Sequence, residues 1–492
     1  MVQSQILDFY ENKNVFITGG TGFLGKVLIE KLLRSTNAAT LYILIRHNKN
    51  HDASTRLERM LNCELFDELR KKRPDYKRRI IAIAGDSAKD NLGLAPEDQE
   101  ELISKVNIVF HVAATVHFNE NLKVAYEVNV QGTKRLLDLS KRFQHLKSIV
   151  HVSTAYANWQ DEVIDESFCE RSFHYKQVES MLQKLSVEKA LRLTPSILKK
   201  WDSTYAFTKA MAEILVRETS NGLPIGIFRP SGIVPSYKEP VNNWVDSFGA
   251  LGLLAFVSLG IARVIPSRLG PIVDLVPVDL VASALIATAW DIPTKDGIPI
   301  YNYVSSIDNP ITFQDFIASF KTHLPRYPLS KAVRAPKVIT QFTTFSKIQH
   351  HYLPALLVDL VYVMTLRTPK MLPTIRKFDS LVEIVALTLD KNWQFANNNV
   401  KGLWNKMNED DRKLFPCDVS IVDWKHHFDN FVKGVRVYLF KDPLSTLPEA
   451  KIRMQRLERA QDALHCYFTS FWKTWDGLCY QNCSFNKIVI GN

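Results

Sequence analysis

The sequence predicts an α/β protein with a doubly wound parallel sheet, followed by a smaller, mainly helical C-terminal domain. From residue 14 to about 290, short apolar runs alternate with segments whose apolar residues recur at helical spacing, the pattern of strands joined by crossover helices. Beyond about residue 330, helical patterns with dispersed aromatic and basic residues take over. A strand, a glycine-rich turn and a helix open the chain, and such a unit indicates where a ligand binds.

The elements of the sheet domain can be placed in order from these patterns. Their short apolar runs are typical of strands that are buried on both faces. The expected strands are residues 15–18, 40–45, 80–84, 108–112, 148–152 and 226–228. The expected helices are residues 25–35, 55–71, 96–104, 129–144 and 204–220. We expect a first domain over residues 1–335, a helical domain over 336–450 and a basic tail over 451–492.

Length, charge and cysteine content narrow the class of protein. A chain of 492 residues is long enough for two or three domains. Its formal net charge of +11 suits an acidic ligand, such as a nucleotide or coenzyme A, or an anionic membrane surface. The basic residues are scattered, so nucleic acid is not an expected partner. We expect no metal centre, because Cys479, Cys483 and His465 form only a partial cluster of a kind that is more often structural.

Glycines at a spacing of three follow the first expected strand. Gly19 permits a tight turn, Gly22 lets the backbone approach a pyrophosphate, and Gly25 lets the next helix pack closely on the sheet. The free N–H groups at the start of that helix then face the anion. A lone glycine triplet is as often an ordinary turn, but here a strand precedes it and an amphipathic helix follows. The predicted phosphate-binding residues of this Rossmann unit are Thr18, Gly19, Thr21, Gly22, Phe23, Leu24 and Gly25.

Residues at the ends of the next strands indicate which dinucleotide is bound. An NAD site carries an acid about 20 residues after the glycine turn, whereas this chain has Arg46 there. A cation suits the 2′-phosphate of NADPH, which is therefore the favoured cofactor; the alternative is that Arg46 only ends a strand. Asp86 follows the third strand, where its carboxylate can accept a hydrogen bond from the adenine amino group. Ala113 and Ala114 follow the fourth, where small side chains leave room for a nucleotide.

A tyrosine and a lysine, Tyr205 and Lys209, stand four residues apart in an expected helix and so share one face. A free tyrosine has a pKa near 10, and we expect the neighbouring ammonium to lower it. Upstream, Ser153 and Thr154 follow the fifth strand, where their hydroxyls can hydrogen-bond a substrate carbonyl oxygen. Each motif alone is weak, but the glycine turn, hydroxyl pair and Tyr-x-x-x-Lys in this order predict hydride transfer to a carbonyl. Tyr205 would supply the proton, and Lys209 would also hold the nicotinamide ribose.

At this point the chain resembles the extended short-chain dehydrogenase/reductases and, within them, fatty acyl-CoA reductases of the eukaryotic, insect-like type. The resemblance covers about residues 8–445. The segments that carry it are residues 18–25, 30–34, 44–46, 85–86, 111–115, 129–133, 151–156, 205–209 and 229–231, together with 393–397 and 423–424, which are similar to the family's C-terminal sterile-type domain. The resemblance also implies that Asn129, Arg229 and Pro230 bind the cofactor.

The resemblance implies an enzyme that reduces a long-chain acyl-CoA to the primary alcohol with NADPH and releases CoA. A first hydride would reduce the thioester carbonyl, while Tyr205 and a Ser153 or Thr154 hydroxyl stabilise the oxyanion. Collapse would expel the CoA thiolate, and a second NADPH would reduce the aldehyde. Two alternatives stay open: a reductase or epimerase of a nucleotide-sugar or sterol, and a non-catalytic NADPH-binding scaffold. The first does not explain the second domain, and scaffolds commonly lack Tyr or Lys of the pair.

Two apolar stretches, residues 249–262 and 353–366, are shorter than the ~18 residues that a spanning helix needs. Each is expected to line the core or a pocket, or else to form an acyl-chain tunnel or enter one membrane leaflet. The six cysteines are sparse and irregular, which favours reduced thiols, and we expect an active site that faces the cytosol. We also expect peripheral or monotopic membrane contact, at the endoplasmic reticulum rather than the peroxisome. The sequence leaves chain-length preference and oligomeric state open.

Overall fold

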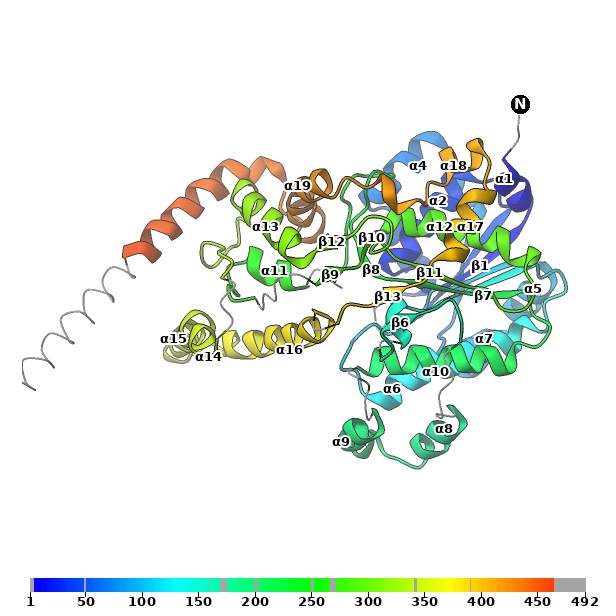
Figure 1. Cartoon of the computed structure of the whole chain (residues 1–492), viewed down its shortest axis with the longest axis horizontal. Coiled ribbons are helices and arrows are strands. Elements are labelled where there is room, and N and C mark those ends of the chain that lie inside the picture. The colour runs from blue at the N-terminus through cyan, green and yellow to red at the C-terminus, as the bar shows by residue number, and fades with distance from the viewer. Residues whose placement is uncertain are drawn as a thin grey trace, which may run out of the picture. The chain divides into compact units, whose positions relative to one another are not determined.

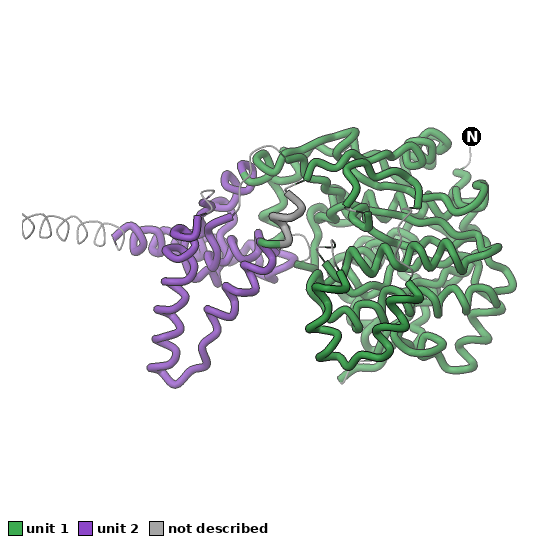
Figure 2. Tube along the Cα trace, turned by 60° about the horizontal axis from the view of Figure 1, so that its bottom comes forward, with its two compact units in different colours: residues 1–251, 268–317, 383–435 green, residues 252–267, 318–382, 436–492 purple. Residues whose placement is uncertain are grey.

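The computed structural model groups the chain into two compact units that interleave in sequence. It describes residues 4–47, 50–158, 160–168, 175–198, 201, 203–248, 252–265, 271–339, 343–389 and 391–463. Unit 1 consists of residues 1–251, 268–317 and 383–435, and unit 2 of residues 252–267, 318–382 and 436–492 (Figure 2). Residues 383–435, which the sequence assigned to the helical domain, are thus part of the unit that holds the sheet. The linear domain boundaries expected from the sequence stay a prediction.

Unit 1 is built on a seven-stranded sheet in which every neighbouring pair is parallel. In spatial order the strands are β11 (Ile300–Tyr303), β7 (Ile225–Pro230), β5 (Ser148–Val152), β4 (Ile108–His111), β1 (Asn14–Thr18), β2 (Thr40–Ile45) and β3 (Ile80–Ala84). The chain runs from β1 to β3 on one side and then returns to β4 on the other side of β1. Such a reversal leaves a crevice at the carboxyl ends of β1 and β4, where doubly wound sheets bind their ligands. The predicted fold class is confirmed.

Helices cover both faces of this sheet. Figure 1 shows α2, α12 and α17 on one face and α6, α7 and α10 on the other. The helices of unit 1 are α1 (Gln5–Tyr10), α2 (Phe23–Ser35), α3 (Ala53–Leu61), α4 (Asp67–Lys72), α5 (Pro96–Lys105), α6 (Leu122–Tyr126), α7 (Gly132–Ser140), α8 (Tyr175–Gln183), α9 (Val187–Leu198), α10 (Thr204–Thr219), α12 (Val278–Asp291), α17 (Asn398–Lys406), α18 (Glu409–Leu414) and α19 (Trp424–Gly434). Short strands pair as β8 (Gly232–Val234) with β10 (Leu275–Pro277), β9 (Ile272–Val273) with β12 (Ile311–Thr312), and β6 (Val163–Ile164) with β13 (Gln394–Phe395).

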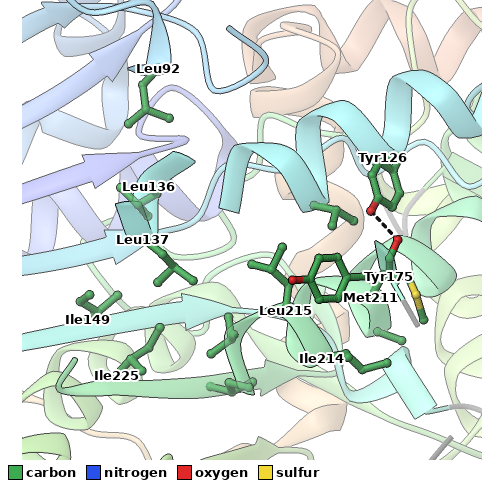
Figure 3. Close-up of a cluster of buried hydrophobic side chains, with 14 of the residues drawn as sticks. Leu92, Tyr126, Leu136, Leu137, Ile149, Tyr175, Met211, Ile214, Leu215 and Ile225 are labelled. Carbon is green, nitrogen blue, oxygen red and sulfur yellow. Dashed lines mark hydrogen bonds between the residues drawn. The ribbon is translucent and has the colours of Figure 1, made fainter. Parts of the chain in front are cut away.

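The face of the sheet under α7 and α10 holds a large apolar core. Figure 3 shows Met211, Ile214 and Leu215 of α10 in the same cluster as Ile149 and Ile225 of the sheet. These side chains are at most 8% exposed, which fixes α10 against the sheet along most of its length. The catalytic residues expected on α10 therefore stand on a rigid support.

Three expectations about local structure are wrong. The predicted helix 55–71 is two helices, α3 and α4, because Cys63 takes an extended backbone conformation between them. The predicted helix 129–144 is α7, preceded by a π-helical turn over Glu127–Gln131. Strand β3 is not buried on both faces: it lies at the sheet edge, where Ile81 is 38% exposed. Strand β11, which pairs with β7, was not expected at all.

Unit 2 is mainly helical. It contains α11 (Gly252–Ser258), α14 (Thr344–Lys347), α15 (Leu353–Met364) and most of α13 (Phe313–His323) and α16 (Met371–Leu389). Residues 348–352 form a π-helical turn that leads from α14 into α15. Every helix in the described residues falls short of the length and apolarity needed to cross a membrane.

Candidate active site

The glycine turn after β1 is packed so tightly that two of its glycines accept no side chain. Gly19 has φ +75°, and a Cβ there would lie 2.5 Å from the backbone nitrogen of Ala113. A Cβ on Gly25 would lie 2.3 Å from the carbonyl oxygen of Gly19. Gly22 is exposed and donates its N–H to that same oxygen at 3.0 Å. The first and third glycines thus set the turn, while the second is exposed and leaves the start of α2 open to solvent.

The start of α2 fits the pyrophosphate of a dinucleotide. Gly22 is the N-cap and has no side chain with which to satisfy the first N–H groups of this 13-residue helix. Helix N-termini of this kind bind anions through free N–H groups and the positive end of the helix dipole. Phe23 stacks on Trp244 at 5.7 Å between ring centroids, and Leu24 is buried, so both contribute packing while their amides stay at the helix start. Thr21 is half-buried in the same turn.

The hydroxyl of Thr18 does not face this open space. Its side chain is fully buried, and Oγ1 lies 2.7 Å from Nδ1 of His111 and accepts a hydrogen bond from the Ala113 amide at 3.3 Å. The other ring nitrogen of His111 contacts Thr133 at 3.0 Å, and burial lowers the pKa of His111 to about 3. Thr18 therefore joins β1 to β4 beneath the glycine turn.

Arg46 and Asp86 meet at the ends of β2 and β3. The Arg46 side chain is 69% exposed, and its guanidinium lies 4.0 Å from the Asp86 carboxylate. At that distance and exposure the ion pair is weak, so the guanidinium stays available for an anion. The other carboxylate oxygen of Asp86 accepts the Ala88 amide at 3.0 Å, which fixes the turn after β3. The structure thus places both predicted strand-end residues together.

Asn129 joins the loop after β4 to α10. Its side-chain oxygen accepts the Thr115 amide at 2.9 Å, and its amide nitrogen donates to the Thr115 carbonyl at 3.2 Å and to Thr208 Oγ1 at 2.9 Å. Ala113 and Ala114, which precede Thr115, are half-buried. Through Asn129 the loop against which Gly19 packs is held to the helix that carries Tyr205 and Lys209.

Of the two predicted hydroxyls, those of Ser153 and Thr154, the one beside Tyr205 is that of Thr154. The Thr154 side chain lies close to the Tyr205 phenol, and the Tyr205 ring also meets Phe118 edge-on at 5.8 Å. Burial raises the pKa of Tyr205 to about 12, and the neighbouring Thr154 hydroxyl works in the opposite direction. The expected lowering of this pKa by Lys209 is wrong, because burial disfavours the charged phenolate. Tyr205 is a neutral phenol at pH 7.

Lys209 lies one turn further along α10 and is almost completely buried. Its ammonium donates to the carbonyl oxygen of Val152, the last residue of β5, at 2.7 Å. Burial lowers the pKa of Lys209 to about 8, while the negative charge of Glu213 raises it. The amine is therefore held at the carboxyl end of the sheet, where a ligand of the crevice would lie.

Ser153 belongs to a buried charge network and not to the Tyr205 pair. Its hydroxyl donates to the Glu213 carboxylate. Arg229 completes the network: Nε and one terminal nitrogen donate to the two Glu213 oxygens at 3.0 and 2.6 Å. The Arg229 guanidinium also donates to the carbonyls of Asp165 and Ser167 and is 0% exposed. Its donors are thus turned toward the protein, and Pro230, which follows it, ends β7 in a buried position.

Glu213 is a residue that sequence reasoning missed. It continues the spacing of four from Tyr205 and Lys209, so all three lie on one face of α10. That spacing was visible in the sequence and could have identified it. Tyr156 and Trp393, whose rings lie 5.2 Å apart beside Ala155, were also missed as neighbours. Nothing local in the sequence indicated that contact, because the two residues are more than 200 positions apart. Cys479, Cys483 and His465 lie outside the described residues.

The fold and this site define a dinucleotide-dependent oxidoreductase. The crevice at the β1–β4 reversal carries a glycine turn and a free helix start, and a tyrosine, a threonine and a buried lysine stand at the neighbouring strand end. Two family models described as male sterility protein match the chain, a dinucleotide-binding model at residues 17–285 and a second model at residues 350–442. The cofactor of this site is accordingly a nicotinamide dinucleotide.

Curated relatives specify the family. The chain is 35% identical over 463 residues to a fatty acyl-CoA reductase of Drosophila melanogaster, covering 93% of this chain and 90% of the relative. It is 35% identical to fatty acyl-CoA reductase 1 of Homo sapiens and 31% identical to fatty acyl-CoA reductase 2 of Mus musculus, each over 92% of this chain and 89% and 90% of the relatives. The chain belongs to the fatty acyl-CoA reductase family.

Solved structures support the fold. The reductase domain of a non-ribosomal peptide synthetase from Mycobacterium tuberculosis matches with a TM-score of 0.57 and 19% identity, covering 89% of this chain and 96% of that one. A thiolation-reductase di-domain from an archaeal non-ribosomal peptide synthetase matches with a TM-score of 0.51 and 17% identity, covering 88% and 78%.

Proposed function

We propose that this protein reduces long-chain fatty acyl-CoA to the primary alcohol with NADPH and releases CoA. The observation that carries the chemistry is that Tyr205, with Thr154 close to its phenol, stands one turn of α10 from the buried Lys209 amine. The substrate class rests on family membership, since relatives at 31–35% identity over 92–93% of the chain are named fatty acyl-CoA reductases.

The residues of the chain have separate tasks in this reaction. When bound, NADPH supplies two electrons and a hydrogen nucleus to the carbonyl carbon at each of two reductions. Tyr205, kept protonated by its raised pKa of about 12, donates a hydrogen bond to the substrate oxygen and gives it a proton when the aldehyde is reduced. Thr154 holds the phenol in place. The phenol is thus in its protonated form at pH 7, as a group that must deliver a proton requires.

The buried charges of α10 and β7 position this pair. The Glu213–Arg229 ion pair and the Ser153 hydroxyl fix the helix face on which Tyr205 and Lys209 stand. Ser153 therefore acts as a positioning residue, and Thr154 is the hydroxyl that contacts the reacting group. Arg229 has the same supporting role, in place of the cofactor contact that the resemblance implied.

NADPH is proposed over NADH because a largely exposed guanidinium, that of Arg46, stands at the end of β2. A cation there complements the 2′-phosphate, whereas NAD-type sites use an acid for the ribose 2′-hydroxyl. The Asp86 carboxylate lies 4.0 Å away and forms only a weak ion pair with Arg46, which leaves the guanidinium available for the phosphate.

The reaction is tested with purified full-length protein, NADPH and either palmitoyl-CoA or a UDP-sugar. We expect NADPH consumption only with palmitoyl-CoA, with hexadecanol detected by gas chromatography and two NADPH used per alcohol formed. Turnover of the UDP-sugar alone would overturn the proposal in favour of a nucleotide-sugar reductase or epimerase.

Cofactor choice is tested separately with Arg46→Ala. Loss of a charge-assisted contact to the 2′-phosphate costs about 1.5–3 kcal/mol, so kcat/KM for NADPH should fall roughly 10- to 100-fold while that for NADH changes little. Lys105→Ala removes an exposed cation of α5 and is the control, with no change expected. An equal effect of Arg46→Ala on both cofactors would contradict the 2′-phosphate assignment.

A further inference from the structure

Helix α15 of unit 2 is apolar and yet exposed. Its exposed side chains are Leu353, Leu356, Leu357, Val358, Leu360, Val361, Val363 and Met364, with exposed fractions of 39–68%. Leu366, just beyond the helix, is 98% exposed, and Phe345 and Ile348, just before it, are 73% and 52% exposed. Contiguous apolar patches of this kind on a protein surface mark sites that another molecule covers.

The helix is held in place by one narrow stripe. His351, Ala355 and Asp359 are spaced by four residues and are buried. The His351 Nε2 atom accepts the Arg263 and Val264 amides, each at 2.9 Å, and Asp359 accepts three amides at the start of α16 at 2.8–2.9 Å. The polar groups of this stripe are turned inward, and they fix the hairpin of α15 and α16 without covering the outer side chains.

The shape of the exposed surface fits a lipid phase better than a protein groove. At 100° per residue, the exposed apolar positions of α15 span an arc of roughly 220° around the helix. A helix that docks in a protein groove needs an apolar stripe of roughly 100° with polar residues opposite. The acyl region of a bilayer surrounds an inserted helix on all of its free sides, so the wide arc matches lipid. The 12-residue helix is about 18 Å long, against a hydrocarbon thickness of about 30 Å, so it fits in one leaflet.

The charges next to the helix fit an anionic lipid surface. Between residues 353 and 378 the sequence holds four basic residues, Arg367, Lys370, Arg376 and Lys377, and one acid, Asp359. Because Asp359 is 4% exposed and bound to three amides, its charge is directed into the protein. Basic residues that flank an apolar helix bind the phosphate and carboxylate groups of anionic lipids.

We propose that α15 and its flanking residues Phe345, Ile348 and Leu366 form a monotopic membrane-docking surface that inserts into the cytosolic leaflet of an anionic bilayer. The apolar arc enters the acyl region, and Arg367 and Lys370 contact lipid headgroups. Membrane docking by α15 is independent of catalysis. If this proposal fails, the proposed reaction is therefore not affected. Location at the endoplasmic reticulum stays a prediction.

The experiment is co-flotation of purified full-length protein with vesicles of phosphatidylcholine containing 20–30% phosphatidylserine (about the range in which basic segments respond to surface charge). The test variant is L357E/L360E, at two positions 54% and 53% exposed. The control is L191E/L193E on α9, with the same chemistry at positions 59% and 43% exposed. We expect the test variant to lose at least tenfold in vesicle partitioning and the control to behave as the unchanged protein.

Two further measurements show whether a loss of vesicle binding comes from lost lipid contact or from lost contact with a second copy of the chain. R367E/K370E should weaken binding to the anionic vesicles and leave weak binding to pure phosphatidylcholine unchanged. Light scattering without vesicles should give the same molar mass for L357E/L360E and the unchanged protein. Vesicle binding that survives L357E/L360E, or that L191E/L193E reduces equally, would overturn the proposal. A smaller molar mass for L357E/L360E with unaltered vesicle binding would assign the surface to a second copy of the chain instead.

Discussion

Helices α10 and α15 reverse the expectation that charged residues lie outside and apolar residues inside. On α10, Lys209 and Glu213 are 2% and 3% exposed, while on α15 Leu356 and Leu357 are each 54% exposed. The difference lies in the partners that each environment supplies. Charge is stable inside unit 1 because an arginine, a serine and a backbone carbonyl meet it with hydrogen bonds. Apolar side chains on α15 have no such cover from the described residues of unit 2, and we propose that lipid supplies it.

Burial serves different purposes at the two helices. The α10 network holds reacting groups in one geometry, and such preorganisation needs every buried polar group to be satisfied. The α15 hairpin bonds Nε2 of His351 and the carboxylate of Asp359 to backbone amides and leaves an apolar surface for another phase. Four measurements test this difference between α10 and α15.

The largest effect is expected from Tyr205→Phe, which keeps the ring and removes the proton donor of α10. General acid catalysis contributes roughly 10²–10⁴-fold, so kcat for alcohol formation should fall by about that factor. Binding of NADPH, followed by protein fluorescence quenching, should stay within about twofold because the ring packing is retained. A variant with undiminished alcohol production would remove Tyr205 from the mechanism.

Removing one partner of the buried charge network comes next. Arg229→Met leaves the Glu213 carboxylate buried without its cation, which costs about 3–5 kcal/mol of unfolding free energy. Urea unfolding followed by circular dichroism measures this loss. The double variant R229M/E213Q should recover part of it, since the uncompensated charge is then gone. A single variant as stable as the unchanged protein would show that the network does not hold α10.

A pair of matched leucines compares the two helices directly. Leu215 of α10 is 0% exposed and lies in the core of Figure 3, whereas Leu357 of α15 is 54% exposed. Leu215→Ala should cost about 2–5 kcal/mol of unfolding free energy, and Leu357→Ala less than about 0.5 kcal/mol. Equal costs in the same urea experiment would mean that α15 is packed within the protein and is not a docking surface.

The smallest effect is a dependence on pH. Burial lowers the pKa of Lys209 to about 8 from an ordinary value of 10.5, so between these values the folded protein loses this proton before the unfolded chain does. The rate of alcohol formation should fall as pH rises through about 8, because Lys209 then loses its positive charge. The contribution of Lys209 to the free energy of unfolding should rise over pH 8–10.5. Tyr205, with a pKa of about 12, stays protonated over most of this range. The variant Lys209→Arg keeps a positive charge at this position over the whole range. A fall of its rate at the same pH would assign the titration to another group.

Most residues of the candidate site could be identified in the sequence, and their roles in the reaction stay predictions. Gly19, Gly22 and Gly25 were placed correctly because a strand, a turn and a helix are local patterns of a few residues each. Ser153 and Thr154 were equal candidates in the sequence, because nothing local distinguishes their hydroxyls, and only the structure shows that Ser153 donates to Glu213. The direction of the Tyr205 pKa was also missed, since spacing on a helix does not reveal how deeply a phenol is buried.

Residues near one another in the chain were enough to predict six of the seven strands of the main sheet, the glycine turn and the Tyr205–Lys209 spacing. Only the tertiary structure decided the partners of Glu213, the neighbours Tyr156 and Trp393, and the exposure of α15. An apolar stretch such as residues 353–366 has the same hydropathy whether it lies in a core or outside it. Which of the two occurs depends on what distant segments bring to cover it, and that is a property of the folded chain.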